Sequence, residues 1–236
     1  MEKFRIGFSK AFLRPDGTPA YPDVDLTPLR ADGRVEVVFV SNESEIRSVD
    51  VAKLDALVLL SESFTSRSLD PAGRLAIVAR FGVGYDKVDI TACSRSGVGV
   101  SITPDAVRRP VAAAVIAMML ALTGRLLIKD RLVRQGPAGF NRRSDYMGYG
   151  LEGRVLGAVG LGNIAAEVFR LARPFGMRFM AHDPFSRPEI AAELGVEMVD
   201  LATLFRQADV LSINCPLTPE TRRLVNRERL SLMKPT

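Results

Sequence analysis

Short apolar runs alternate with helical or turn segments along the first part of the chain. The runs predict strands at 5–8, 35–40, 56–60, 76–80 and 98–102. Each run is short and mainly apolar, as expected of strands that are covered on both faces of a parallel sheet. Segments such as Ser44–Val51 and Val88–Ser96 predict the helices and turns between them. The pattern therefore predicts an α/β unit with a parallel sheet.

A different pattern follows this unit. From Pro110 to about Gln135 the sequence predicts one long helix, with Gly136 as its stop. Residues Val111–Leu122 are apolar all round, so we expect the helix to be buried on most sides. That run is too short for a bilayer, which takes about 20 residues. A core helix, a domain bridge and a subunit interface all fit the pattern. The glycine- and arginine-rich residues 136–150 predict an exposed loop.

The most informative stretch begins with a predicted strand at Val155–Val159. A glycine turn, Gly160-Leu161-Gly162-Asn163-Ile164-Ala165, leads into a helical run. A second predicted strand, Arg178–His182, is followed directly by Asp183. This order of strand, glycine turn, helix, strand and acid is typical of a dinucleotide-binding βαβ unit.

Each part of that stretch has a physical reason. Gly160 permits a tight turn off the strand, and Gly162 lets the backbone approach a pyrophosphate closely. Ala165, at the usual place of a third glycine, is small enough for close packing of helix and strand. The helix N-terminus offers free N–H groups to phosphates. A carboxylate at Asp183 can accept both ribose hydroxyls of an adenosine.

Two alternatives stay open for this stretch. The first is a plain βαβ turn without a ligand. The second concerns the cofactor: Asp183 favours NAD, because a carboxylate repels the 2′-phosphate of NADP, but Arg187 nearby can soften that preference.

Further alternation follows Asp183. The sequence predicts a helix at 188–194, a strand at 196–199, a helix at 201–208 and a strand at 209–214. Cys215 and Pro216 come at the carboxyl end of the last strand, where doubly wound sheets bind ligands. We expect Cys215 beside the adenosine and not as a nucleophile, because no histidine or other base lies near it. Thr218 and Pro219 predict a helix start.

Composition narrows the class of protein. With 47% hydrophobic and 25% charged residues in 236, the chain can bury a proper core. The net charge of +5 is dispersed, without a basic run that would indicate a nucleic-acid partner. Cys93 and Cys215 lack metal-ligand spacing, so we expect no metal site and a reducing compartment. The N-terminus shows no signal-peptide pattern. We therefore expect a cytoplasmic protein without a membrane partner.

Three motifs together resemble the D-isomer-specific 2-hydroxyacid dehydrogenases, the group that includes D-3-phosphoglycerate dehydrogenase and glyoxylate or hydroxypyruvate reductase. The first is a loop after a predicted strand; its composition alone fits either a ligand loop or a tight turn. The motifs are Arg80-Phe81-Gly82-Val83-Gly84-Tyr85-Asp86, the Gly160–Ala165 turn with Asp183-Pro184, and Asn214-Cys215-Pro216-Leu217-Thr218-Pro219-Glu220-Thr221.

The resemblance implies two doubly wound parallel-sheet domains. Residues 1–103 would form a flavodoxin-like substrate-binding domain and residues 104–236 an incomplete NAD-binding Rossmann domain, with the active-site cleft between them. It implies a small 2-hydroxy or 2-oxo acid as substrate and a homodimer at full length, formed largely through the NAD-binding domain.

The resemblance also assigns site residues. It places Val83 and Gly84 at substrate, Val83 and Val111 at the nicotinamide, and the remaining cofactor contacts at Gly160, Gly162, Asn163, Ile164, Asp183, Cys215 and Pro216. The sequence departs from the family pattern at Ala165 and at Ala113, where many relatives carry glutamate.

Two requirements of the chemistry are missing. Hydride transfer to or from a hydroxy acid needs a cation for the carboxylate and an acid/base for the hydroxyl proton. The only histidine, His182, is expected on the adenosine side in a structural role. In the family the arginine, glutamate and histidine follow the segment that resembles Leu230–Pro235. We therefore expect no catalytic residue in this chain, a truncated sequence, an exposed edge at strand 209–214 and no turnover.

Three functions compete. The first is an NAD-dependent oxidoreductase of D-2-hydroxy acids. The second is a non-catalytic NAD-sensing or interaction protein of the same fold. The third, another Rossmann enzyme such as a methyltransferase, is disfavoured by the two motifs that flank the glycine turn.

Overall fold

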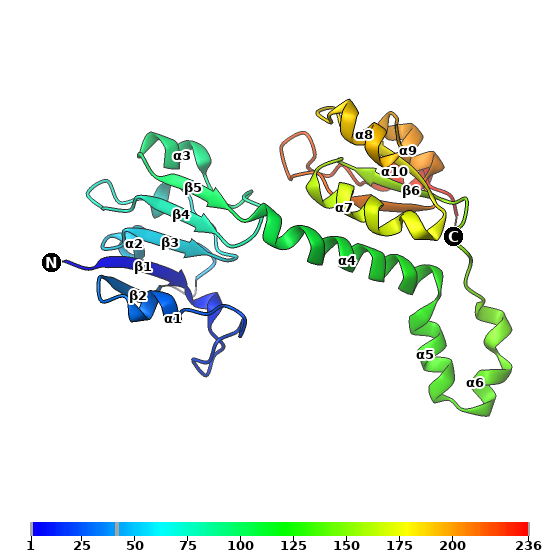
Figure 1. Ribbon diagram of the computed structural model, residues 1–236, viewed down its shortest axis with the longest axis horizontal. Coiled ribbons are helices and arrows are strands. Elements are labelled where there is room, and N and C mark those ends of the chain that lie inside the picture. The colour runs from blue at the N-terminus through cyan, green and yellow to red at the C-terminus, as the bar shows by residue number, and fades with distance from the viewer. Residues whose placement is uncertain (1, 41–42, 236) are drawn as a thin grey trace. The chain divides into compact units, whose positions relative to one another are not determined.

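A computed structural model describes residues 2–40 and 43–235, so Thr236 lies outside the described residues. The chain divides into two compact units, residues 1–104 and 105–236. Each unit contains one parallel sheet with helices on it (Figure 1). The predicted α/β class is confirmed for both units.

The first unit holds a five-stranded sheet in the order β2-β1-β3-β4-β5. This is the flavodoxin-like order, in which the chain reverses direction across the sheet between β1 and β3. Every pairing is parallel, and the predicted strands recur within two residues of their expected ends. The strands are β1 (Phe4–Ser9), β2 (Val35–Val40), β3 (Ala56–Leu59), β4 (Ile77–Arg80) and β5 (Gly99–Ile102).

Short helices connect these strands. Their apolar side chains pack with β3 and β4 in a core that includes Leu57, Phe64 and Val78, each fully buried. Mainly apolar strands such as β3 are expected in a parallel sheet with helices on its faces. The helices are η1 (Lys10–Phe12), α1 (Thr27–Ala31), α2 (Ser48–Val51), η2 (Ser66–Ser68) and α3 (Ile90–Arg95).

The second unit holds a four-stranded sheet in the order β8-β7-β6-β9. Numbered from β6, this is the 3-2-1-4 arrangement of a Rossmann sheet, with the change of direction between β6 and β9. Within the described residues β9 stands at the edge of the sheet, paired with β6. The strands are β6 (Val155–Val159), β7 (Arg178–His182), β8 (Val196–Met198) and β9 (Val210–Ile213).

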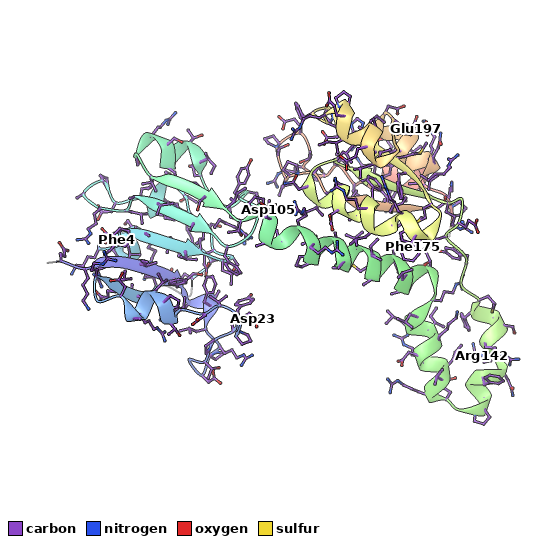
Figure 2. All side chains as sticks on the ribbon, viewed as in Figure 1. Phe4, Asp23, Asp105, Arg142, Phe175 and Glu197 are labelled. Atoms are coloured by element: carbon purple, nitrogen blue, oxygen red, sulfur yellow. The ribbon has the colours of Figure 1, made fainter. Side chains whose placement is uncertain are left out.

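The helices of the second unit cover this sheet and extend beyond it. Phe169 of α7 and Phe179 of β7 stack at 4.9 Å between ring centroids inside the core. The helices are α4 (Pro104–Thr123), α5 (Leu126–Arg134), α6 (Pro137–Asn141), η3 (Arg143–Tyr146), α7 (Asn163–Ala172), η4 (Arg173–Phe175), α8 (Pro188–Leu194), α9 (Leu201–Gln207) and α10 (Arg227–Leu232). Figure 2 shows their side chains, with Asp105 early in α4 and Arg142 beside α6.

The prediction of one helix from Pro110 to Gln135 is wrong at both its start and its middle. The helix α4 begins at Pro104, because proline fits the first turn, where its missing N–H leaves no bond unmade. Pro110 lies inside the helix. The run then breaks at Arg125, whose backbone is left-handed with φ 51°, and α5 begins at Leu126.

Burial of this helix on most sides is also wrong for the single chain. One stripe of α4 is buried, with Ala112, Met119 and Thr123 at helical spacing, while Met118 and Leu122 are exposed. At 20 residues the helix is long and apolar enough to cross a membrane by length and composition alone, which corrects the estimate from the apolar run. Its buried stripe packs into the core of the second unit.

Two local predictions need correction. Residues 136–150 contain α6 and η3 and are not wholly a loop. Thr218 starts no helix: its hydroxyl accepts a bond from the Thr221 N–H at 3.3 Å, but a turn follows. Left-handed backbone at Arg223, with φ 56°, is incompatible with helix continuation.

Candidate functional site

Two glycines at the end of β6 have different structural roles. Gly160 has φ +89°, and a Cβ added there would lie 2.9 Å from the backbone nitrogen of Cys215. Glycine is therefore required for the turn and for the approach of the segment after β9. Gly162 has φ −87°, and a Cβ added there meets no described atom within 4 Å. The backbone at Gly162 thus faces open space.

The helix α7 begins at this open backbone. Its first-turn N–H groups, at Asn163, Ile164 and Ala165, point out of the helix start without an intrahelical partner. Ala165 is fully buried in the core, which agrees with the close packing expected of a small residue at this position. Free N–H groups and the positive end of the helix dipole favour an anion in front of Gly162.

The carboxylate of Asp183 lies beside the same turn. One oxygen accepts the Leu161 N–H at 2.8 Å, and the other accepts the Phe185 N–H at 2.8 Å. Each carboxylate oxygen has a further lone pair. Asp183 is half-buried, so both oxygens can also accept a hydroxyl from a ligand.

A cavity of about 370 Å³ joins these groups. Gly162, Asn163 and Asp183 all line it, so three predicted cofactor residues share one space. The other lining residues are Arg108, Leu161, Ala166, Arg170, Phe185, Ser186, Arg187 and Ile190.

Two of the lining arginines were not found from the sequence. A signal existed for Arg170, since Asn163, Ala166 and Arg170 follow one face of α7 at helical spacing. No local signal placed Arg108 there, because it comes from α4.

Cys215 and Pro216 lie where β9 ends, beside Gly160. Neither lines the cavity at Asp183. Burial raises the pKa of the Cys215 thiol, and the negative charge of Asp183 raises it further. A thiol with a raised pKa is a poor nucleophile at neutral pH.

The side chain of His182 contacts the protein backbone. Its Nδ1 lies 3.0 Å from the carbonyl oxygen of Val199, and its own carbonyl accepts the Gly160 N–H at 2.8 Å. These two contacts join β7 to the segment after β8 and to the glycine turn. The only histidine of the sequence thus has a structural role next to Asp183.

Val111, on α4, does not line the cavity, whereas Arg108, one helical turn earlier, does. Val83 and Gly84 lie in the first unit, on the loop after β4. Thr103 anchors that loop: its Oγ1 accepts the Gly82 N–H at 2.8 Å, and its N–H donates to the Gly82 carbonyl at 2.9 Å.

A smaller cavity of about 150 Å³ adjoins this loop within the first unit. Its lining includes Gly84 together with Arg80 and Lys87. The ammonium of Lys87 donates to the Ser61 carbonyl at 2.7 Å, and a guanidinium N–H of Arg80 donates to the Phe81 carbonyl. The space is of the size that a small acid needs, and its charged lining residues are two cations, Arg80 and Lys87, and two carboxylates, Glu62 and Asp86.

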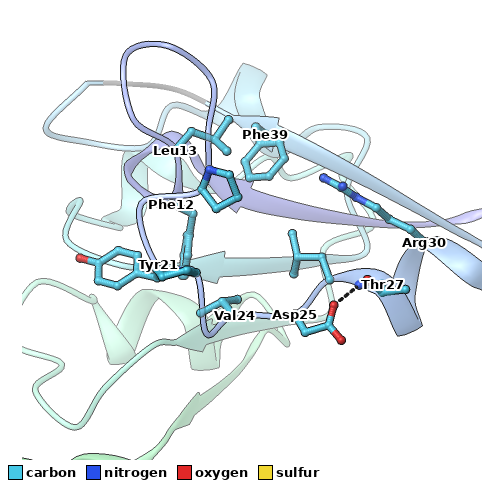
Figure 3. Close-up of a pocket in the computed structure, with 11 residues that line it drawn as sticks. Phe12, Leu13, Tyr21, Val24, Asp25, Thr27, Arg30 and Phe39 are labelled. Atoms are coloured by element: carbon cyan, nitrogen blue, oxygen red, sulfur yellow. Dashed lines mark hydrogen bonds between the residues drawn. The ribbon is translucent and has the colours of Figure 1, made fainter.

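The largest aromatic cluster lines another pocket in the first unit, of about 320 Å³ (Figure 3). Phe12, Tyr21 and Phe39 form its walls, with Arg30 at its margin. Phe12 also meets Phe81 edge to face at 5.3 Å between ring centroids. This pocket was not predicted from the sequence, although all of its lining residues lie between positions 12 and 39.

Metal chemistry finds no support among residues 2–40 and 43–235. They contain no group of three or more His, Cys, Asp or Glu side chains arranged to hold a metal ion.

Comparison with known proteins shows which family the chain belongs to. Residues 116–236 match the model of the D-isomer specific 2-hydroxyacid dehydrogenase NAD binding domain. The glyoxylate reductase of Thermococcus onnurineus is 36% identical over 228 residues, which cover 93% of this chain and 68% of the reductase. This chain belongs to the D-isomer-specific 2-hydroxyacid dehydrogenase family.

Two further proteins of this family are also similar to the chain. The D-3-phosphoglycerate dehydrogenase of Synechocystis is 35% identical over 214 residues, covering 90% of this chain and 38% of that enzyme. The crystal structure of D-lactate dehydrogenase from Aquifex aeolicus, complexed with NAD and lactic acid, superposes with a TM-score of 0.80 at 26% identity, covering 97% of this chain and 66% of that one. NAD is therefore the cofactor of the second unit, and the open backbone at Gly162 and the carboxylate of Asp183 fit it.

Proposed function

We propose that this chain represents an NAD-dependent oxidoreductase that acts on the CH–OH group of D-2-hydroxy acids. The observation that carries the proposal is the shared cavity of Gly162, Asn163 and Asp183 at the start of α7. A pyrophosphate would accept the N–H groups of Asn163 and Ile164, and the Asp183 carboxylate would accept the ribose hydroxyls. Bound NAD supplies the chemistry of hydride transfer.

In this proposal one unit binds the substrate and the other binds the cofactor. Residues 1–103 would bind the small 2-hydroxy or 2-oxo acid, with Val83 and Gly84 at the substrate and Val83 also at the nicotinamide. Residues 104–236 would bind NAD, with Val111 near the nicotinamide and Cys215 and Pro216 near the adenosine. Support comes from the anchored loop at Gly82 and from the small cavity that Gly84 lines.

We further propose that the 236 residues by themselves do not turn over substrate. Proton transfer at the substrate hydroxyl needs a general acid or base within hydrogen-bond reach. The only histidine, His182, is bonded to Val199 on the adenosine side of the unit. Without a histidine in position to transfer that proton, the chain should bind NADH and leave it unoxidised.

Titration and turnover test these points separately. NADH fluorescence should rise on binding to the full chain, and glyoxylate, hydroxypyruvate or pyruvate should not consume the bound NADH. Failure to bind NADH would overturn the proposed function, and rapid NADH oxidation would overturn the proposed lack of turnover. NADH-dependent recovery of a protein partner, without turnover, would support the alternative of a non-catalytic NAD-sensing protein.

A homodimer and a cytoplasmic location complete the proposal. Several large apolar side chains on α4, α5 and α6 are exposed, and a large exposed apolar surface is typical of a subunit interface. They are Val111, Met118, Leu122, Leu126, Leu127, Val133 and Phe140. Light scattering after gel filtration should give a dimer mass for the wild type.

A charged substitution on that surface should dissociate the proposed dimer. We expect a monomer mass for Leu122→Glu and for Leu127→Glu, since a buried unpaired carboxylate is costly. Val49→Glu is the matched control, because Val49 is equally exposed, at 72% against 71% for Leu122, but lies on α2. A dimer mass for both Leu122→Glu and Leu127→Glu would contradict the proposed interface.

A further inference from the structure

The cavity beside Asp183 carries more positive charge than recognition of an adenosine diol requires. Three arginines line it, Arg108, Arg170 and Arg187, against the single carboxylate of Asp183. Arg108 is paired with Asp105 at 3.1 Å, and Arg170 with Glu193 at 2.9 Å. The side chain of Arg187 has no hydrogen bond or ion pair with any residue that the structure describes.

The loop after β7 brings this unpaired guanidinium to the ribose acid. The Phe185 N–H donates to the Asp183 carboxylate at 2.8 Å, which turns the chain directly after β7. Ser186 and Arg187 follow, and both line the same cavity as Asp183. Arg187 is also the residue before the first turn of α8, so the start of a helix fixes its backbone.

The carboxylate of Asp183 is partly satisfied by the protein itself. Backbone N–H groups of Leu161 and Phe185 each donate to one of its oxygens at 2.8 Å. Hydrogen bonds of this kind stabilise the negative charge and hold the carboxylate at the glycine turn. A 2′-phosphate would still meet its repulsion, but an unpaired arginine in the same cavity can offset it with two parallel hydrogen bonds.

We propose that this site binds NADP(H) as well as NAD(H), with Arg187 holding the 2′-phosphate of the adenosine ribose. Ser186 stands beside Arg187 in the cavity lining and offers a hydroxyl donor to the same phosphate. The inference rests on the assigned dinucleotide site and concerns which dinucleotides enter it. It predicts that the affinities for NADPH and NADH lie within about tenfold of each other.

Titration of the full chain with NADH and with NADPH tests this inference. The chain contains no tryptophan, so the fluorescence of the reduced nicotinamide can be followed without overlap. In Arg187→Gln we expect NADPH to bind roughly 10- to 100-fold more weakly, the range of a lost charge-assisted pair. NADH should lose less than about threefold, because it lacks the phosphate that Arg187 would hold.

Two further variants sharpen the test. Arg187→Lys keeps the charge but loses the paired hydrogen bonds, so its NADPH affinity should fall between those of the wild type and Arg187→Gln. Arg178→Gln is the matched control, because Arg178 is an exposed arginine at the opposite end of β7 and does not line the cavity. It should change neither affinity more than about twofold, apart from weak long-range charge effects.

The outcomes are distinguishable. Wild-type binding of NADH with NADPH more than about 100-fold weaker would overturn this inference and leave NAD binding intact. The same holds if Arg187→Gln loses no NADPH affinity relative to Arg178→Gln. If neither dinucleotide binds to the folded wild type, the dinucleotide site itself is wrong.

Discussion

Alanine at the two glycines of the β6 turn should have opposite effects. At Gly160, φ is +89°, and an added Cβ would lie 2.9 Å from the Cys215 nitrogen and 3.1 Å from its Cα. Left-handed backbone costs a residue with a side chain roughly 1–2 kcal/mol. Displacement of the crowded segment after β9 adds about 1–3 kcal/mol. We therefore expect Gly160→Ala to lose roughly 2–5 kcal/mol of unfolding free energy, a large share of a typical domain's stability.

At Gly162 the same substitution should leave stability almost unchanged. Its φ of −87° suits alanine, and the added Cβ meets no described atom within 4 Å. Loss of backbone freedom in the unfolded chain gains about 0.4–1 kcal/mol, and alanine at a helix N-cap costs a similar amount. The methyl group would instead occupy the space in front of α7. We expect NADH to bind at least about tenfold more weakly, or roughly 1.4 kcal/mol.

Two measurements on each variant check this contrast. Urea unfolding followed by circular dichroism gives the stability, and the midpoint should shift for Gly160→Ala alone. NADH fluorescence titration of the folded protein gives the affinity, which should fall for Gly162→Ala. Full NADH affinity in Gly162→Ala would refute the placement of the phosphate there. Wild-type stability in Gly160→Ala would refute the close approach of the Cys215 backbone.

Three further predictions follow from single side chains. Asp183→Ala should weaken NADH binding at least about tenfold in the same titration, because a charge-assisted acceptor of the ribose hydroxyls is lost. Asp209→Ala should lower the unfolding free energy by about 1–3 kcal/mol, because the buried Val155 N–H loses its acceptor. Burial would raise the pKa of Asp209, but the Val155 N–H and the Lys234 ammonium outweigh it and hold that pKa below its usual value. Its stabilisation is thus complete above the ordinary aspartate pKa of about 3.9 and is lost as pH falls through the folded-state pKa, so urea midpoints of the wild type and Asp209→Ala should converge in acid. Cys215 should react with a thiol reagent more slowly than free cysteine at neutral pH, because burial raises its pKa.

Local signals in the sequence determined the strands and the glycine turn. The strands Val155–Val159 and Arg178–His182 were predicted with the bounds that the structure shows. A strand end, a glycine turn and an acid after the next strand are all encoded within one βαβ unit. Such features depend on neighbouring residues, so the sequence suffices to predict that Gly162 and Asp183 line one cavity.

Long-range packing decided the rest. The break at Arg125 in the helix from Pro104 was not predicted from the sequence, although Gly124 lies directly before the break. Nor was it predicted that Arg108 and Asp183 line one cavity, since the two residues are far apart in the sequence. The sequence alone determined the alternation of strands and helices and the glycine turn after β6, because these follow from backbone conformation and neighbouring side chains. Which distant arginines share the cavity, and which face of α4 is buried, depends on contacts that exist only in the folded chain.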